Sequence, residues 1–355
     1  MYNIQLNKKG VVRTGRTLSI MPTYQCNARC TNCGTYSNPH RKIHLKRKQI
    51  EKAINEAVEL NFLNVVFTGG EPTLRINDLI YGLKITSERG LLTRIVTNAH
   101  WAKSIKVALE FVSLLLDNGL NEINFSTGDE HSKFIPLENI VNAILACNEL
   151  GLKFHVMVER TKNNFVTKKS ILEHPRVRAR NLEEKINIYI DENPWMSLNY
   201  NDIIDYDDGL VINEDNIKAC TGCHSILQTI VLQADGNIGA CCGLGMQTIQ
   251  ELQVGHIDNS KALLKAITES ENDIFKLALR YIGPEKILSW AALKNKAIVW
   301  SGQYSHRCQF CMRIYKDKQV KECILKYFEE KISQIIYAAT FDEVLFPQYI
   351  DKVEV

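Results

Sequence analysis

The sequence predicts an α/β fold in which six parallel strands form a partial (β/α)6 barrel of the TIM type, followed by a smaller C-terminal domain. Apolar segments suited to strands alternate with helical patterns from residue 17 to about residue 190. Gly90, Gly119 and Gly151 each follow a predicted helix, where a glycine commonly ends it. Six consecutive βα units favour a parallel sheet, and such sheets bend into complete or partial barrels.

The elements follow one another in a regular order along the barrel. The predicted strands cover residues 17–21, 64–67, 92–97, 122–126, 153–158 and 186–190. The predicted helices between them cover residues 47–60, 77–89, 103–118, 137–150 and 166–173. A last amphipathic helix is expected over residues 324–338, with Leu325, Phe328, Ile332 and Ile335 on one face.

Changes in composition divide the chain into four parts. Residues 1–195 hold the barrel, and residues 196–219 form an Asp- and Asn-rich linker. Residues 220–323 form a second domain rich in cysteine, and residues 324–355 form the C-terminal helix and tail. Only about 16 residues precede the first strand, so no additional N-terminal domain is expected.

Charge and hydropathy exclude several classes of partner. The net charge is +3, from 43 basic and 40 acidic residues, so neither nucleic acid nor a membrane is an expected partner. The densest basic run, residues 41–48, is typical of a solvated loop and helix start; its alternative reading is a patch for an acidic peptide or a cofactor carboxylate. No apolar stretch is long enough for a membrane span or a signal peptide. A cytoplasmic location follows, where the 11 cysteines remain reduced and available to metals.

Polar residues gather after each predicted strand. They are Cys26 to Cys33, Thr68 to Pro72, Thr97 and Asn98, Ser126 to His131, Glu159 and Arg160, and Asp191 to Asn193. In βα barrels the active site is built from the loops at the C-terminal ends of the strands. The six segments are therefore expected to meet at one mouth of the barrel.

The cysteines after the first strand have the spacing Cys-x3-Cys-x2-Cys, at Cys26, Cys30 and Cys33. Three thiolates can hold three irons of a [4Fe-4S] cube and leave the fourth iron open for chemistry. The alternative is a zinc site, but structural zinc takes four protein ligands and no fourth thiol follows within the loop.

Together with Thr68-Gly69-Gly70-Glu71-Pro72 one βα unit later, this cysteine motif resembles the radical S-adenosylmethionine (radical SAM) superfamily. The resemblance implies that S-adenosylmethionine binds the open iron, and that Gly69, Gly70 and Glu71 bind its methionine ammonium. An electron from a reductant such as flavodoxin or ferredoxin would then release a 5′-deoxyadenosyl radical.

Further positions match this superfamily less specifically. The resemblance places Thr97, Asn98, Ser126, Asp129 and Arg160 near the cosubstrate, with Arg160 as a candidate partner for the methionine carboxylate. Each residue type is also common as a strand-end cap or a surface residue. One position departs from the pattern, because many relatives carry an aromatic residue where this chain has Asn32.

The second cysteine set surrounds a predicted β-hairpin with strands at residues 230–232 and 238 and a turn at residues 235–237. The set resembles the SPASM/Twitch domain, which implies an auxiliary [4Fe-4S] cluster held by Cys223, Cys241, Cys308 and Cys311. A zinc ribbon is the alternative, because two Cys-x2-Cys pairs also suit zinc. Cys220 or Cys242 could replace its neighbour as a ligand, or could donate a hydrogen atom to a substrate radical.

The expected function is radical modification of a ribosomally synthesised peptide, by epimerisation or crosslinking. The alternative within the superfamily is a dehydrogenase or epimerase of a small molecule, such as a sugar alcohol or an aminoglycoside. A non-enzymatic alternative is a zinc-stabilised binding protein.

Overall fold

The structure is a computed structural model that describes residues 15–345. Its strands join into one sheet with the order β6-β5-β4-β3-β2-β1-β7-β8-β9. The strands are β1 Thr17–Ile20, β2 Asn64–Phe67, β3 Leu92–Thr97, β4 Glu122–Thr127, β5 Lys153–Arg160, β6 Ile190–Pro194, β7 Thr229–Leu232, β8 Asn237–Gly239 and β9 Gln253–His256. The first six are parallel and paired in chain order, which confirms the predicted partial barrel.

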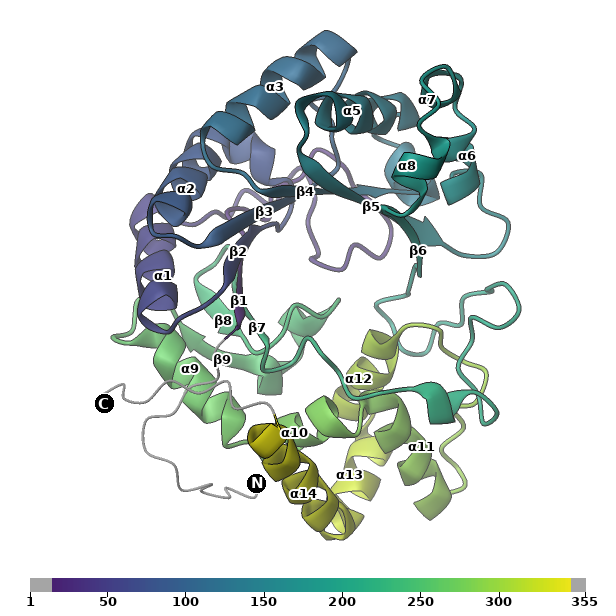
Figure 1. Cartoon of the computed structure of the whole chain (residues 1–355). Coiled ribbons are helices and arrows are strands. Elements are labelled where there is room, and N and C mark those ends of the chain that lie inside the picture. The colour runs from purple at the N-terminus through teal and green to yellow at the C-terminus, as the bar shows by residue number, and fades with distance from the viewer. Residues whose placement is uncertain (1–14, 346–355) are drawn as a thin grey trace.

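The helices of the barrel lie outside the arc of strands (Figure 1). They are α1 Arg47–Glu59, α2 Ile76–Glu88, α3 Ile105–Asp117, α5 Leu137–Leu150, α6 Lys168–Leu172, α7 Pro175–Arg178 and α8 Glu183–Asn187. The short helix α4, Asp129–Ser132, instead lies at the ends of β4 and β5, beside Glu159. The N-terminus of α3 shows why such a segment becomes a helix. The Ser104 hydroxyl accepts a hydrogen bond from the Val107 amide at 3.3 Å, which satisfies a donor that the helix itself leaves unpaired.

The second half of the chain adds six helices within the described residues. These are α9 Ala262–Glu271, α10 Ile274–Tyr281, α11 Pro284–Lys294, α12 Arg307–Lys316, α13 Lys318–Tyr327 and α14 Glu329–Leu345. Short 3-10 turns cover Pro72–Arg75, Ile217–Ala219, Met246–Thr248 and Gln250–Leu252. No helix in residues 15–345 has the length and apolar character needed to cross a bilayer.

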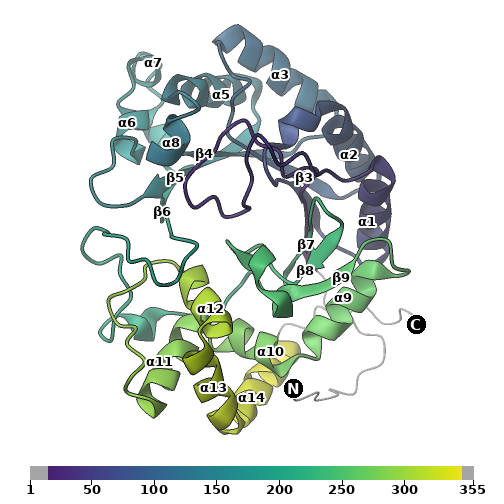
Figure 2. The ribbon, with the colours of Figure 1, turned by 180° about the vertical axis from the view of Figure 1, so that it is seen from behind.

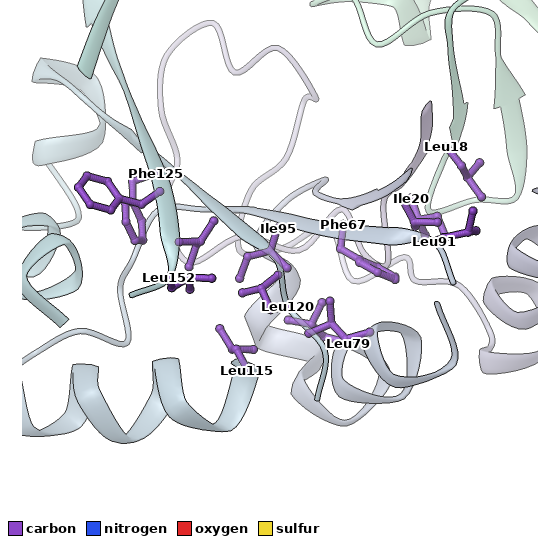
Figure 3. Close-up of a cluster of buried hydrophobic side chains, with 14 of the residues drawn as sticks. Leu18, Ile20, Phe67, Leu79, Leu91, Ile95, Leu115, Leu120, Phe125 and Leu152 are labelled. Atoms are coloured by element: carbon purple, nitrogen blue, oxygen red, sulfur yellow. The ribbon is translucent and has the colours of Figure 1, made fainter. Parts of the chain in front are cut away.

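The main core lies between the strands and the outer helices. Figure 3 shows Leu18, Ile20, Phe67 and Ile95 of the strands and Leu79 of α2 in this layer. Packing is close enough that a Cβ on Gly82 of α2 would lie 2.6 Å from the Phe67 ring, so glycine lets helix and strand approach. This contact fixes α2 against β2, directly behind the Gly69-Gly70-Glu71 segment.

The predicted hairpin is confirmed, and its place in the sheet adds an unexpected connection. Strand β7 pairs in parallel with β1, with Leu18 opposite Ile230, and β8 then pairs antiparallel with β7. The hairpin between the second set of cysteines therefore continues the barrel sheet. The predicted domain limits stay a prediction, but the two cysteine-bearing regions share strands of one sheet (Figure 1).

Two predicted elements are wrong. The strand predicted over residues 186–190 begins only at Ile190, and residues 183–187 form α8 instead. The alternating Ile186, Ile188 and Ile190 suggested a strand. The helix instead buries Ile186 and leaves Ile188 70% exposed, and acidic Glu183 and Glu184 favour a helix N-terminus there.

The helix predicted over residues 324–338 is instead parts of α13 and α14, which meet at Phe328. Phe328 is buried beside Phe275, with ring centroids 5.3 Å apart. Ile335 is also buried, whereas Leu325 is 55% exposed. Phe328, Ile332 and Ile335 thus pack on the core as predicted, whereas Leu325 and the continuous helix over these residues were wrong.

The central position of β1 predicts a large difference between two leucines of the sheet. Leu18 is fully buried between β2 and β7, so Leu18→Ala should lower the free energy of unfolding by about 2–5 kcal/mol. Leu92 of β3 is 58% exposed, and Leu92→Ala is the matched control with less than about 1 kcal/mol expected. Anaerobic urea denaturation measures both. Equal losses would contradict the central role of β1.

Candidate functional site

The first cysteine set lies in the loop between β1 and α1, which passes across an open end of the barrel in Figure 2. The loop folds back on itself through backbone hydrogen bonds. The Tyr24 amide donates to the Ile43 carbonyl at 3.0 Å, and the Cys26 amide donates to the Asn38 carbonyl at 3.2 Å. Cys26, Cys30 and Cys33 are therefore carried by a loop with defined backbone contacts on both sides.

The three thiols are partly buried, and two of them have hydrogen-bond partners. The Ala28 amide donates to Cys26 Sγ at 3.4 Å, and Thr35 Oγ1 lies 3.4 Å from Cys33 Sγ. Burial raises the pKa of Cys26 to about 12, and burial together with neighbouring Cys33 raises the pKa of Cys30 further. These two thiols are protonated in the metal-free protein, so metal binding would release protons and strengthen as pH rises.

Gly69 and Gly70 lie directly against the chain that leads to Cys26. The Gly70 amide donates to the Thr23 carbonyl at 2.8 Å, and the Glu71 amide donates to the Gln25 carbonyl at 2.9 Å. A Cβ on Gly69, where φ is +113°, would lie 2.7 Å from the Thr23 carbonyl oxygen, and one on Gly70 would collide with the Gln25 backbone. Both glycines are required by this close backbone approach.

The Glu71 carboxylate is buried and already holds several donors of the protein. Oε1 accepts hydrogen bonds from the Thr73 hydroxyl at 2.6 Å, the Thr73 amide at 3.2 Å and the Thr97 hydroxyl at 2.8 Å. Oε2 accepts from the Asn98 amide at 2.9 Å. The side chain thus connects the end of β2 to the end of β3, and its predicted contact with the methionine ammonium stays a prediction.

Thr97 and Asn98 extend this network to the first cysteine. The Asn98 side-chain amide donates to Asn27 Oδ1 at 3.0 Å and lies 3.7 Å from Cys26 Sγ. Thr97 Oγ1 also accepts from the indole of Trp101 at 3.2 Å. Glu71, Thr97, Asn98 and Cys26 therefore form one continuous group, as expected for residues around a common site.

The end of β4 contributes a second contact to the cysteine loop that the sequence did not predict. Glu130 accepts a hydrogen bond from the Thr31 amide at 3.0 Å and pairs with Lys133. Glu159 of β5 is buried and accepts from the Glu130 and His131 amides, and the His131 ring lies 3.1 Å from its Oε2. Gly128 makes room, since a Cβ there would collide with Glu159. The only sequence indication was a polar run after each of these strands.

Three other predicted residues have local contacts. Asp129 accepts hydrogen bonds from the amides of Phe165 at 3.1 Å and Val166 at 2.7 Å, and so shapes the loop after β5. Arg160 donates to Asp207 at 2.7 and 3.0 Å and to Glu192 at 3.2 Å. Ser126 is half-buried on β4, opposite Met157 of β5. Their predicted contacts with the cosubstrate stay predictions.

A groove lies beside these residues at the C-terminal ends of β4 and β5. Its volume is about 540 Å³. Its lining residues are Asp129, Glu130, Ser132, Lys133, Glu159, Thr161, Asn164, Phe165, Val166 and Trp195. Phe165 is 89% exposed, so the groove combines charged walls with an exposed aromatic side chain.

The second cysteine set surrounds a separate cavity. Four cysteines line it, namely Cys223, Cys241, Cys308 and Cys311, and most other lining residues are apolar. A Cβ on Gly243 would lie 3.3 Å from Cys308 Sγ and 3.4 Å from Cys241 Sγ, so the backbone there closely approaches both thiols. Burial raises the pKa of Cys308 to about 12 and also raises the pKa of Cys241 and Cys311. Three of the four thiols are thus protonated until a metal binds.

Cys220 and Cys242 are outside the lining of this cavity. Cys242 is exposed, and its thiol lies 3.1 Å from the Ser225 hydroxyl. Cys220 is half-buried beside Glu285 and Arg307. Burial raises the pKa of its thiol most, and the nearby Glu285 carboxylate raises it further. The four predicted ligands line one cavity, whereas Cys242 lies at its edge, beside Cys241 and the lining residue Ser225.

The two cysteine sets are connected through their loops. The Gly245 amide donates to the carbonyl of Gly34, next to Cys33, at 2.9 Å. The Leu244 side chain packs so closely on Gly34 that no Cβ would fit there. Asn32 Oδ1 accepts from the Leu198 amide at 3.3 Å, so this unusual residue contributes a further loop contact.

The donor sets fit iron–sulfur clusters. Within the described part of the chain, no three His, Cys, Asp or Glu side chains converge on one point that could hold a single metal ion. In a [4Fe-4S] cube each cysteine binds a different iron, so its thiolates need not converge. The buried thiols, the hydrogen bonds to sulfur and the close glycine backbone are environments in which such ligands are held.

The fold and this site define the class of protein. Residues 20–174 match the model of the Radical SAM superfamily. This part of the chain is therefore a radical SAM domain, which uses a [4Fe-4S] cluster and S-adenosylmethionine, and the predicted superfamily is confirmed.

Several curated proteins resemble parts of the chain. PqqA peptide cyclase of Bradyrhizobium diazoefficiens is 33% identical over 108 residues, 29% of this chain and 26% of that protein. The putative peptide biosynthesis protein YydG of Bacillus subtilis is 24% identical over 130 residues, 36% of this chain and 41% of that protein. GTP 3′,8-cyclase of Desulforamulus reducens is 26% identical over 208 residues, 52% of this chain and 59% of that protein. The chain thus spans between about a quarter and three fifths of these relatives.

One solved structure resembles nearly the whole chain. It is native anSMEcpe with bound AdoMet and the Cp18Cys peptide, with a TM-score of 0.52 and 15% sequence identity. The match covers 91% of this chain and 99% of that chain. At this level of identity the likeness shows a common fold that extends beyond the radical SAM domain.

The contact between Gly70 and the Gln25 backbone predicts a local loss of metal. Gly70→Ala should displace the cysteine loop and lower bound iron from about eight to about four atoms per chain, if each cysteine set holds a cube. Gly151→Ala is the control, because its Cβ meets nothing within 4 Å, although its φ of +72° costs about 1 kcal/mol. Iron assay and circular dichroism of anaerobic protein measure the outcome. Full iron in Gly70→Ala would contradict it.

Proposed function

We propose that the chain is a radical SAM enzyme that modifies a ribosomally synthesised peptide, by epimerisation or by crosslinking. The observation that carries the proposal is the backbone contact of Gly70 and Glu71 with Thr23 and Gln25. It holds a three-cysteine loop at the ends of β1, β2 and β3 in a radical SAM domain. This is the mouth of the barrel, where a βα fold assembles its chemistry.

Cys26, Cys30 and Cys33 would hold three irons of the first cluster, and the site around Glu71, Thr97 and Asn98 would orient the cosubstrate. When bound, the cluster and S-adenosylmethionine supply a 5′-deoxyadenosyl radical that abstracts a substrate hydrogen atom. The Asn98 amide near Cys26 Sγ would stabilise that thiolate by hydrogen bonding. The Glu71 carboxylate would keep Thr97 and Asn98 in place rather than contact the substrate.

Cys223, Cys241, Cys308 and Cys311 would hold an auxiliary [4Fe-4S] cluster. Their common cavity supports this ligand set over one that includes Cys220 or Cys242. Four thiolates close such a cluster, so it would accept or pass electrons rather than bind substrate. If these cysteines instead form a zinc ribbon, metal analysis would find zinc at this site in place of iron.

The proposal of a peptide substrate rests on two relatives. PqqA peptide cyclase and the putative peptide biosynthesis protein YydG are both named for peptides. The groove with exposed Phe165 has room for a peptide side chain at the ends of β4 and β5. A small-molecule substrate is the second candidate, because GTP 3′,8-cyclase matches a longer part of the chain.

Reduction of the first cluster should start the chemistry without any substrate. Anaerobic protein should be brown, and with dithionite it should convert S-adenosylmethionine to 5′-deoxyadenosine, which chromatography detects. Cys26→Ala should reduce this product to the level of buffer, whereas Cys147→Ala should not, because Cys147 is buried in α5 away from both sets. Colourless, zinc-loaded wild type would overturn the proposed function.

The auxiliary site predicts a separate effect on iron. Cys308→Ala should lower iron from about eight to about four atoms per chain, while cleavage of S-adenosylmethionine by dithionite persists. Cys323→Ala is the control, because the Cys323 thiol also lies in a helix of this region but donates a hydrogen bond to the Ala291 carbonyl. This variant should keep all its iron. Iron that is unchanged in Cys308→Ala would exclude this ligand.

A free thiol near the second site would complete an epimerisation. Either Cys242 or Cys220 would then give its hydrogen atom to the substrate radical, and in deuterated water the product would gain one deuterium. Replacing the donor, by Cys242→Ala or Cys220→Ala, should abolish this gain while both clusters remain. A gain that persists in both variants would exclude these two thiols as donors, and a wild-type product that has lost two hydrogens and gained no deuterium would identify crosslinking.

A further inference from the structure

The cysteine loop has an unusual distribution of charge. Residues 17–50 contain six lysines and arginines and no aspartate or glutamate. The whole chain has a net charge of +3, so removing the +6 of this segment leaves −3 for all other residues. The segment with the first three cysteines is therefore the basic part of an otherwise slightly acidic chain.

The basic side chains alternate along an extended stretch beside Cys26. Arg41 lies over the Tyr24 ring at 3.6 Å and Leu45 is buried, whereas Lys42, His44 and Lys46 are exposed. Ile43 between them is 45% exposed. Because side chains alternate along an extended chain, Ile43 lies on the side of Leu45. We call the exposed side chains of Lys42, His44 and Lys46 the basic face.

The acidic side chains around this stretch already have partners. Asp78 pairs with Arg47 and Arg75, Glu51 with Arg89, and Glu130 with Lys133, while Asp258 accepts from Gln49 and Asp235 lies beside Tyr24. Within residues 15–345, no ion pair joins Lys42 or Lys46 to a carboxylate. The positive potential of the basic face is thus left to act on solvent and on partners.

The basic face is also connected to the first cluster site by short backbone contacts. The Ile43 carbonyl accepts from the Tyr24 amide at 3.0 Å, two residues before Cys26. The Asn38 carbonyl accepts from the Cys26 amide at 3.2 Å. An electron arriving at this surface could pass along the hydrogen-bonded backbone of residues 24–26 to the first thiolate.

We propose that the basic face docks an acidic one-electron donor protein of the flavodoxin type. The inference rests on the proposed function, which requires one electron at the cluster of Cys26, Cys30 and Cys33. The reduced donor loses one electron and the cluster gains it, so no bond breaks and no proton moves. The two lysines and His44 place several donors on one side of the stretch, and no ion pair neutralises the lysines within residues 15–345. Rim charges of opposite sign would steer the donor and raise its association rate.

A substrate is a less suitable occupant of this face. A substrate must reach the open iron inside the barrel mouth, where the groove beside Glu159 and Trp195 lies on other strands. An electron donor needs only to dock close to the cluster and does not have to enter the barrel. The position of the basic face on the cysteine loop itself therefore favours the electron donor over an acidic peptide.

The test compares two reductants on a charge-reversed variant. Lys42→Glu with Lys46→Glu should slow 5′-deoxyadenosine formation about tenfold when reduced flavodoxin is the donor at low salt. With dithionite, a small reductant that needs no docking surface, the variant should match wild type. Lys46 precedes α1, where a glutamate suits the helix N-terminus, so folding should be preserved. The control is Lys106→Glu with Lys185→Glu, two exposed lysines of α3 and α8 that give the same change in net charge.

A second readout measures docking without turnover. The dissociation constant for flavodoxin should rise about tenfold in the variant, and added salt should remove the difference. Carbodiimide should crosslink flavodoxin carboxylates to Lys42 or Lys46, as mass spectrometry of peptides can identify. Unchanged affinity, equal loss with both reductants, or crosslinks to a Glu-rich peptide but not to flavodoxin would each overturn the inference. Absence of 5′-deoxyadenosine from wild type with dithionite would instead overturn the proposed function.

Discussion

The candidate site depends on one short stretch of backbone pairing, in which residues 68–71 after β2 continue along residues 20–25 after β1. The Thr68 amide donates to the Ile20 carbonyl at 2.8 Å, and the Gly70 and Glu71 amides continue the pairing to Gln25. Only glycine at positions 69 and 70 permits this separation. Because Cys26 is the next residue, the geometry of the cysteine loop follows from a contact that involves no cysteine.

Strand β1 carries the same constraint to the second cysteine set. It pairs with β2 on one side and with β7 on the other. The hairpin that precedes Cys241 is therefore hydrogen-bonded to β1, the strand that precedes Cys26. The bond from the Gly245 amide to the Gly34 carbonyl then joins the two loops directly. Backbone contacts therefore hold the two cysteine loops in a defined position relative to each other.

The sequence predicted the barrel well because buried strands and their helices repeat with a strong period. It failed at residues 183–190, where alternating isoleucines imitate a strand, and at Phe328, where a bend interrupts one helical pattern. The first cysteine set was predicted from its spacing and the second from its resemblance to a known domain, and their roles as cluster ligands stay predictions. The contacts of Glu130 with Thr31 and of Leu244 with Gly34 were not, because they join residues about 100 and 210 positions apart with no local pattern.

The residues at the strand ends differ in what they contact, as Arg160 and Asp129 show. Those on β2 and β3 reach toward Cys26, whereas those beyond β4 and β5 hold neighbouring loops: Asp129 the loop at Phe165, and Arg160 the linker at Asp207. The first group holds the loop of Cys26, Cys30 and Cys33 in place. In the second group, Asp129 lines the groove and binds a loop, a kind of segment that tolerates sequence change better than strands do. The residues that fix the cysteine loop therefore lie mostly at the ends of β2 and β3, next to β1 in the sheet, whereas Arg160 beside β6 fixes the linker.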